Sequence, residues 1–343
     1  MAENKDFEAI MKEITGGLSG DPEIDMKYLH EQGEKYKDHK YAQEILRACG
    51  RLMYELIPED KKEEMNKALA KDGIGIDATL EEIRFNIYKK NFDKALNMME
   101  SMVEKYEKEP LFMDDSVSEY HCFREPMEEI LYRMVSGTEK DLRRSPIENA
   151  EIYLLYGSLL VELKRPEDAE KALAKAIRWN PTYAKLAFEH AETFKIRGLI
   201  EDFGKLTRDV FKIAYRPDDL ARCYRNMGYY FVEMKEYKAA VCCLLFSSQF
   251  EKNDMVQSEL YYISQVSGET FNPTNDELHE IFEKHGIPYG PEIEILKAAY
   301  GYGRAFYEKG DMQTAGYFLN IFTSFIDDES ANKMMEDIKS KGQ

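Results

Sequence analysis

Residues 150–183 decide the fold, and they read AEIYLLYGSLLVELKRPEDAEKALAKAIRWNPTY. Apolar residues recur at helical spacing on both sides of the Arg-Pro pair at 165–166, which predicts two helices joined by a short turn. Gly157 and Ala169 are small, one in each helix, so we expect the helices to approach closely there. The Asn-Pro pair at 180–181 ends the unit. The stretch therefore predicts a helical hairpin.

The same pattern recurs along the chain. Gly228 and Gly303 take the position of Gly157 in two later segments, and Ile83 takes it in an earlier, weaker one. Successive positions of this kind lie 71 to 75 residues apart, which leaves room for two units of about 34 residues in each interval. We therefore expect a further, more degenerate hairpin in each interval, as at 184–215.

The pattern resembles the tetratricopeptide repeat, a helix–turn–helix unit with fixed aromatic, glycine, alanine and proline positions. Three further stretches resemble a group of bacterial tetratricopeptide-array proteins without an assigned activity: GGLSGDPE at 16–23, RWNP at 178–181 and ARCYRNMGYY at 221–230. The resemblance implies an all-α fold, a right-handed superhelical solenoid of helix–turn–helix hairpins. We expect about seven or eight hairpins along the chain.

The regularity of the pattern divides the chain into four parts. We expect an N-terminal region of helices or degenerate repeats over 1–75, a repeat-like hairpin plus an irregular insert over 76–145, the main array over 146–329 and a capping helix over 330–343. The terminal helix is polar, which suits the solvent-facing cap that an open array requires.

Individual helices are predicted outside the clearest repeats. They are expected near 6–14, 25–36, 41–56, 60–70 and 126–135, with a hairpin from 255–266 and 273–285. The sequence SPIE at 145–148 has the form of a capping box with Pro at the first helical position. We therefore expect the first helix of the 150–183 hairpin to begin there.

The composition excludes several classes of function. The chain has 343 residues and a formal net charge of −18, and nucleic acids and anionic membranes bind cationic patches, so we expect neither as a partner. The N-terminus lacks the features of a signal peptide, and no apolar run is long enough to span a membrane. The five cysteines show no CxxC spacing. These features predict a cytoplasmic location.

The sequence shows no catalytic or cofactor-binding motif. Gly198 to Leu206 differs from a phosphate loop in its glycine spacing, and Leu206 replaces the Ser or Thr that would hold magnesium. His279 and His285 are six residues apart, which places them on different faces of a helix, so they cannot share a metal. We expect both histidines to be exposed. We predict no enzyme activity, no catalytic residue, no cofactor and no metal.

The family resemblance implies a peptide-binding groove along the first helices of the hairpins. The groove positions it assigns to this chain are Lys185, Phe188, Arg222, Arg225, Tyr229, Lys297, Tyr300 and Arg304. Basic and aromatic residues gather at these positions although the whole chain is acidic. They favour an acidic peptide or a C-terminal carboxylate as the ligand. The alternative is that the basic side chains balance acidic neighbours.

Two hypotheses of function follow. The first is a scaffold or adaptor that binds a protein or peptide segment in the groove. The alternative is a helical-repeat protein with an unrecognised catalytic or nucleotide-responsive site, with the irregular segment 110–149 as the candidate region. The sequence leaves the oligomeric state and the identity of the partner open.

Overall fold

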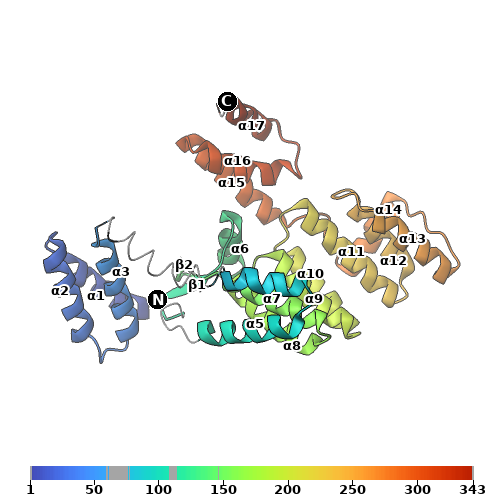
Figure 1. The fold of residues 1–343 in the computed structure, drawn as a ribbon. Helices are drawn as coiled ribbons and strands as arrows, with labels where there is room; N and C mark the ends of the chain where they lie inside the picture. Colours follow the sequence, from blue (N-terminus) through green and yellow to red (C-terminus); the bar gives the residue numbers. More distant parts are fainter. Residues whose placement is uncertain are drawn as a thin grey trace. The chain divides into compact units, whose positions relative to one another are not determined.

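The computed structural model describes residues 2–58, 61, 76, 78–107, 114–145 and 147–341. Its contacts form two compact units, Met1–Cys122 with Thr138–Ile152, and Phe123–Gly137 with Tyr153–Gln343. Both are mainly helical, and consecutive helices pack against each other, so the predicted all-α fold of helical hairpins is confirmed (Figure 1). Within the described residues, every helix is either too short or too polar to span a bilayer. The four-part division of the sequence stays a prediction.

The first unit contains helices and one small sheet. Its elements are α1 (Ala2–Gly16), α2 (Pro22–Lys35), α3 (Ala42–Glu55), a helix over 78–88, α5 (Phe92–Glu107), β1 (Ser118–His121) and β2 (Asp141–Arg144). The first three match the helices expected near 6–14, 25–36 and 41–56. The helix expected near 60–70 lies outside the described residues except for residue 61.

The glycine-rich turn before α2 has a defined role. Gly20 has a φ of 85°, a conformation that favours glycine. The buried Asp25 carboxylate accepts hydrogen bonds from the Ser19 backbone N–H and hydroxyl and from the Gly20 N–H. These bonds, led by that from the Ser19 backbone, lower the pKa of Asp25. Asp21 caps the helix by accepting from two N–H groups of its first turn.

The small sheet corrects two expectations from the sequence. β1 and β2 pair in parallel, from Ser118 opposite Asp141 to His121 opposite Arg144. The Ser145 N–H continues this pairing by donating to His121 O at 2.8 Å. Helix α7 begins at Asn149, after Ser145 has extended the sheet pairing, so the predicted capping box is wrong. The Ser145 hydroxyl instead forms a local turn, accepting from the N–H of Ile147 at 3.2 Å.

The second unit holds the hairpins. Its helices are α6 (Pro126–Ser136), α7 (Asn149–Glu162, whose first turn belongs to the first unit), α8 (Pro166–Trp179), α9 (Ala184–Ile196), α10 (Ile200–Phe211), α11 (Pro217–Glu233), α12 (Tyr237–Ser247), α13 (Asp254–Ser267), α14 (Asn275–His285), α15 (Ile293–Lys309), α16 (Met312–Thr323) and α17 (Glu329–Lys341). Helices α6, α13, α14 and α17 lie where the sequence predicts them.

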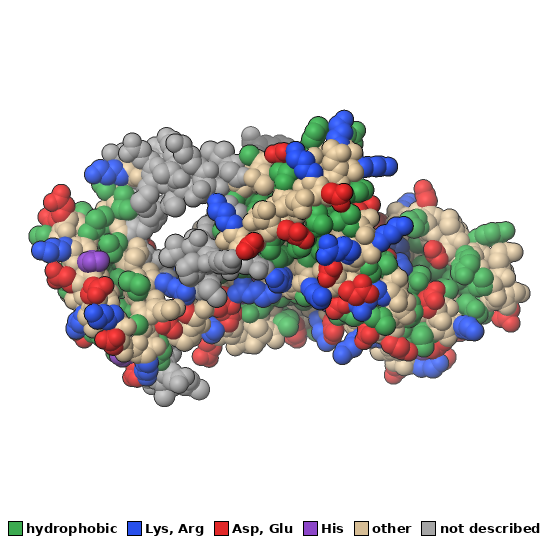
Figure 2. Space-filling view, turned by 60° about the horizontal axis from the view of Figure 1, so that its bottom comes forward, with side chains coloured by type: hydrophobic (Ala, Val, Ile, Leu, Met, Phe, Trp, Pro, Cys, Tyr) green, Lys and Arg blue, Asp and Glu red, His purple; other side chains and the backbone are tan. Residues whose placement is uncertain are grey.

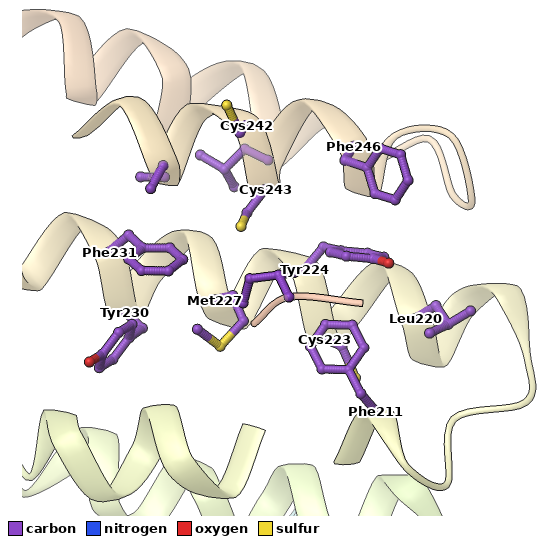
Figure 3. Packing of buried hydrophobic residues seen from close by; sticks show 14 of the residues in the cluster. Phe211, Leu220, Cys223, Tyr224, Met227, Tyr230, Phe231, Cys242, Cys243 and Phe246 are labelled. Atoms are coloured by element: carbon purple, nitrogen blue, oxygen red, sulfur yellow. The ribbon is translucent and has the colours of Figure 1, made fainter. Parts of the chain in front are cut away.

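The largest core of this unit extends from α9 to α14. Figure 3 shows Cys243 of α12 pointing toward α11, with Cys242 on the opposite side of the same helix. Tyr224 of α11 is fully buried; its hydroxyl donates to Pro288 O at 2.7 Å and accepts from the Gly290 N–H at 2.8 Å. These two bonds tie α11 to the loop that precedes α15.

The last hairpin, α15–α16, has a separate core. It packs against α6 and Tyr215, through Met127 and Leu131 of α6 and Phe318 of α16 among others. The insert between the two strands therefore supplies a structural helix to the second unit. Glu128 of α6 is only 1% exposed and contacts the segment after α8. Its carboxylate accepts from the Asn180 side chain and from the Arg124 N–H, each at 2.7 Å.

Candidate functional site

Helix α11 places its polar side chains on one side because its apolar residues are needed on the other. Pro217 occupies the first turn, followed by two aspartates that suit the positive end of a helix. Tyr224 and Gly228 face the core. Arg222, Arg225 and Tyr229 fall between the buried positions and stay partly exposed. We call these three residues, with Glu189, Glu192 and Lys195 of α9, the first-helix face.

Arg222 already has two partners on α9. Its guanidinium lies 3.1 Å from Glu189 Oε1 and 4.6 Å from the centre of the Phe188 ring. Phe188 is 1% exposed and belongs to the core. The Arg222 guanidinium therefore covers the Phe188 ring, and a ligand could contact this ring only if Arg222 moved.

Arg225 points toward the segment between α12 and α13, at the end of its own hairpin. Its Nη1 atom lies 2.7 Å from Glu251 Oε2, and both side chains are mostly covered. Glu251 precedes α13, so the ion pair joins α11 to the segment that starts the following helix. A carboxylate ligand at Arg225 would have to displace Glu251 or share the guanidinium with it.

Tyr229 of α11 contacts both helices of the preceding hairpin, α9 and α10. Its ring contacts Phe203 edge-on at 5.7 Å, and the Lys195 ammonium lies 4.3 Å from the ring centre. Burial raises the pKa of the Tyr229 hydroxyl, and Glu233 of α11, Glu192 of α9 and Glu259 of α13 add to the effect. The hydroxyl is thus a protonated hydrogen-bond donor in acidic surroundings.

The remaining predicted residues lie on α9 and α15. Lys185 is exposed near the start of α9. In the described part of the chain, Lys297 and Arg304 form ion pairs within α15, each at 2.7 Å, with Glu294 and Glu308. Tyr300 packs on Phe322 at 5.0 Å. The contacts thus bring Arg222 and Phe188 together between α11 and α9, while Tyr229 contacts Lys195 further along the same two helices. The α15 residues instead pair within their own hairpin.

The sequence analysis missed an apolar stripe on α13. Met255, Tyr262 and Val266 are 66%, 52% and 44% exposed, on the helix that carries Glu259 beside Tyr229. Hydrophobic side chains are visible on the surface over α13 and α14 in Figure 2. The signal was present in the sequence, since residues 255, 262 and 266 share one side of a helix, but the pattern alone does not show which side the core takes.

A cavity of about 310 Å³ lies in the second unit between α6, the start of α11 and α16. The Glu125 carboxylate at its wall accepts hydrogen bonds from the hydroxyls of Tyr215 and Tyr317, each at 3.0 Å, and pairs with Arg216. Burial alone would raise the pKa of Glu125, but Arg216 and the two hydroxyls outweigh it and lower the pKa. This charged group is therefore satisfied internally.

Cys223 of α11 and Cys243 of α12 are both fully buried. Burial raises the pKa of the Cys223 and Cys243 thiols well above the usual value, so they are poor nucleophiles. Among the described residues, no three His, Cys, Asp or Glu side chains gather as metal ligands would. His279 is exposed as predicted, but the expectation for His285 is wrong. Its side chain is 13% exposed and its ring lies 4.7 Å from that of Phe231.

No family model matches the chain, and no curated protein matches it. Among solved structures, 31 chains match. One is the crystal structure of the APC/C hetero-tetramer Cut9-Hcn1, at 12% identity and a TM-score of 0.33, with 98% of this chain and 64% of that chain covered. The chain thus spans less than two thirds of that neighbour's length.

Proposed function

We propose that the protein is an interaction scaffold that binds a segment of a protein partner along α9, α11 and α13. The observation that carries the proposal is the first-helix face. Two successive first helices contribute to it, and their side chains contact each other: Arg222 pairs with Glu189, and the Lys195 ammonium lies against the Tyr229 ring. Such prior ordering reduces the entropy lost when a partner binds. The cytoplasmic location stays a prediction from the sequence.

The basic residues predict an acidic or carboxylate-bearing ligand. Its carboxylates would bind to arginines that already form ion pairs within the chain. Glu189 and Glu251 must be exchanged for the ligand's carboxylates, so the electrostatic gain is a difference between two similar ion pairs. The exchange is favourable if the ligand binds both guanidiniums at once and packs on Tyr229. The acidic ligand is therefore the version of the proposal that most needs a direct test.

The test is capture of partners from a lysate by the full chain and by Arg222→Glu/Arg225→Glu. We expect the double variant to lose the captured protein. The control Lys205→Glu/Lys212→Glu changes the net charge equally at two exposed lysines, one on α10 and one directly after it, and should retain capture. Undiminished capture by the first variant, with an unaltered melting curve, would place the binding surface elsewhere.

Charge reversal at Arg225 also removes a partly buried ion pair, so stability needs its own control. The variant Arg225→Glu/Glu251→Arg restores an ion pair with the charges exchanged. A binding role of Arg225 predicts that this swap recovers the melting temperature but not capture. Recovery of both would mean that Arg225 acts only by stabilising the fold.

The second hypothesis has one observation in its favour, the cavity beside Glu125 at the edge of the segment 110–149. Its Arg216 could contact an anionic small molecule. A thermal-shift screen of the full chain with nucleotides tests this directly. A reproducible stabilisation that is lost in Arg216→Gln with the fold retained would favour a nucleotide-responsive protein over a pure scaffold.

A further inference from the structure

Helix α13 has two distinct apolar faces. Val256 and Ile263 are buried against the core. Met255, Tyr262 and Val266 lie within about 40° of one another around the helix, at 100° per residue, and are exposed. We call these three residues the α13 stripe. Exposed apolar side chains are common singly, whereas a row of them along one helix is typical of an interaction surface.

The charges around the α13 stripe are mostly negative, although the exposed Lys252 lies two residues before α13. Helix α13 contains Asp254 and Glu259 but no Lys or Arg, and residues 254–285 as a whole contain seven acidic residues and one lysine. No ion pair within the described part of the chain engages Asp254 or Glu259. Glu233, at the end of α11, is exposed and shares with Glu259 the surroundings of Tyr229. The apolar row is thus bordered by uncompensated negative charge.

We infer that the α13 stripe binds a cationic amphipathic segment of the partner, with apolar side chains on Met255, Tyr262 and Val266 and Lys or Arg side chains on Asp254, Glu259 and Glu233. This inference rests on the proposed scaffold function and specifies the chemistry of one end of its binding surface. The apolar contacts supply affinity, and the opposite charges supply orientation and a faster association rate.

Other occupants fit the charges less well. A second copy of this chain would bring two hairpins of net negative charge together, and like charges across an interface oppose association. An acidic segment meets the same repulsion at α13, even if Arg222 and Arg225 attract it further along the surface. A segment without charge would leave Asp254 and Glu259 unpaired at the border of the contact.

The inference is tested with two labelled peptides that share one amphipathic leucine pattern, one with lysine and one with glutamate at every polar position. Fluorescence anisotropy with the full chain measures both affinities. We expect the lysine peptide to bind at least about tenfold more tightly than the glutamate peptide. Raising the salt concentration should lower the affinity of the lysine peptide but leave residual binding through the apolar contacts.

Variants locate the site and separate it from the general attraction of an acidic protein for a cation. Tyr262→Ala/Val266→Ala should lower the affinity for the lysine peptide by about tenfold, since two exposed apolar contacts are lost. Glu259→Lys should do the same, whereas Asp202→Lys, an equal charge change at an exposed position of α10, should have little effect. Equal losses for Glu259→Lys and Asp202→Lys would overturn the inference, because binding would then follow net charge alone.

The remaining outcomes distinguish this inference from the proposed function. Equal affinity of both peptides would show that the charges at α13 do not select the ligand. A partner captured through Arg222 and Arg225 that is unaffected by Tyr262→Ala/Val266→Ala would overturn the α13 inference and leave the scaffold function standing. Concentration-dependent association of the chain that Tyr262→Ala/Val266→Ala abolishes would assign the stripe to a second copy.

Discussion

Leu319 packs directly against the Cα atom of Gly303: a Cβ placed on that glycine would lie 2.8 Å from Leu319 Cγ. The same contact joins Gly157 to Leu173 and Gly228 to Leu244, each time across 16 residues. The three clearest hairpins are therefore closed by one recurring pair. In each, the glycine of the first helix leaves the space that the leucine of the second helix fills.

This contact predicts opposite effects for two glycines of the same helix. Gly303→Ala should destabilise the protein by about 1–3 kcal/mol, because the methyl group overlaps Leu319 and the hairpin must shift. Gly301→Ala has open space around its added carbon and should be neutral or stabilising by up to about 1 kcal/mol, from helix propensity. Denaturant unfolding of both variants measures the difference. Equal effects would mean that the Gly303–Leu319 contact does not limit the packing of α15 on α16.

The fold could be predicted because this pair repeats in the sequence at a constant spacing. The hairpin α9–α10 was harder to recognise, since Ala191 replaces the glycine and Thr207 replaces the leucine. Both residues are buried. Alanine is larger than the glycine it replaces and threonine is smaller than the leucine, so the summed volume of the two side chains changes little. The sheet formed by β1 and β2 could not be predicted, because its four-residue strands show no alternation of apolar and polar residues and depend on pairing between distant segments.

Thr207 gives a prediction of increased stability. Its hydroxyl is buried and has no hydrogen-bond partner among the described residues. Thr207→Val keeps the shape of the side chain and removes this group, so we expect a gain of about 1 kcal/mol in the free energy of unfolding. Thr193→Val is the matched control in the same hairpin. That hydroxyl, equally buried, donates to His190 O at 2.7 Å, so its removal should not stabilise. Thermal unfolding of both variants measures the effect. A lower melting temperature for Thr207→Val would show that the Thr207 hydroxyl has a hydrogen-bond partner in the wild type.

The candidate site was predicted only in part, for a related reason. Sequence spacing places Arg222, Arg225 and Tyr229 on one helix side, but it does not reveal which acidic residues of other helices neutralise them. Glu189 lies on α9, 33 residues before Arg222. Glu251 lies between α12 and α13, 26 residues after Arg225. The α13 stripe was missed because recognising it requires knowing which apolar residues the core buries.

The last prediction concerns pH and the anchor of α6. Glu125, which precedes α6, joins Tyr215 and Arg216 to Tyr317 of α16, and its pKa is lowered because these partners outweigh the effect of burial. A carboxyl group whose pKa is lower in the folded state stabilises the fold above its ordinary pKa, and this contribution disappears as the pH falls through the folded value. We therefore expect Glu125→Gln to cost about 1–3 kcal/mol at neutral pH.

The pH dependence is the sharper part of this prediction. The difference in unfolding free energy between the wild type and Glu125→Gln should shrink as the pH falls below about 4. The wild-type carboxyl then becomes protonated, so that both side chains are neutral. Glu129→Gln on the same helix is the control. The Glu129 side chain is 45% exposed and pairs with Arg133 at 3.1 Å, so its loss should cost at most about 0.5 kcal/mol. Urea unfolding at several pH values measures both. A Glu125→Gln difference that stays constant into the acid range would show that the charge of Glu125 does not stabilise the docking of α6 on the last hairpin.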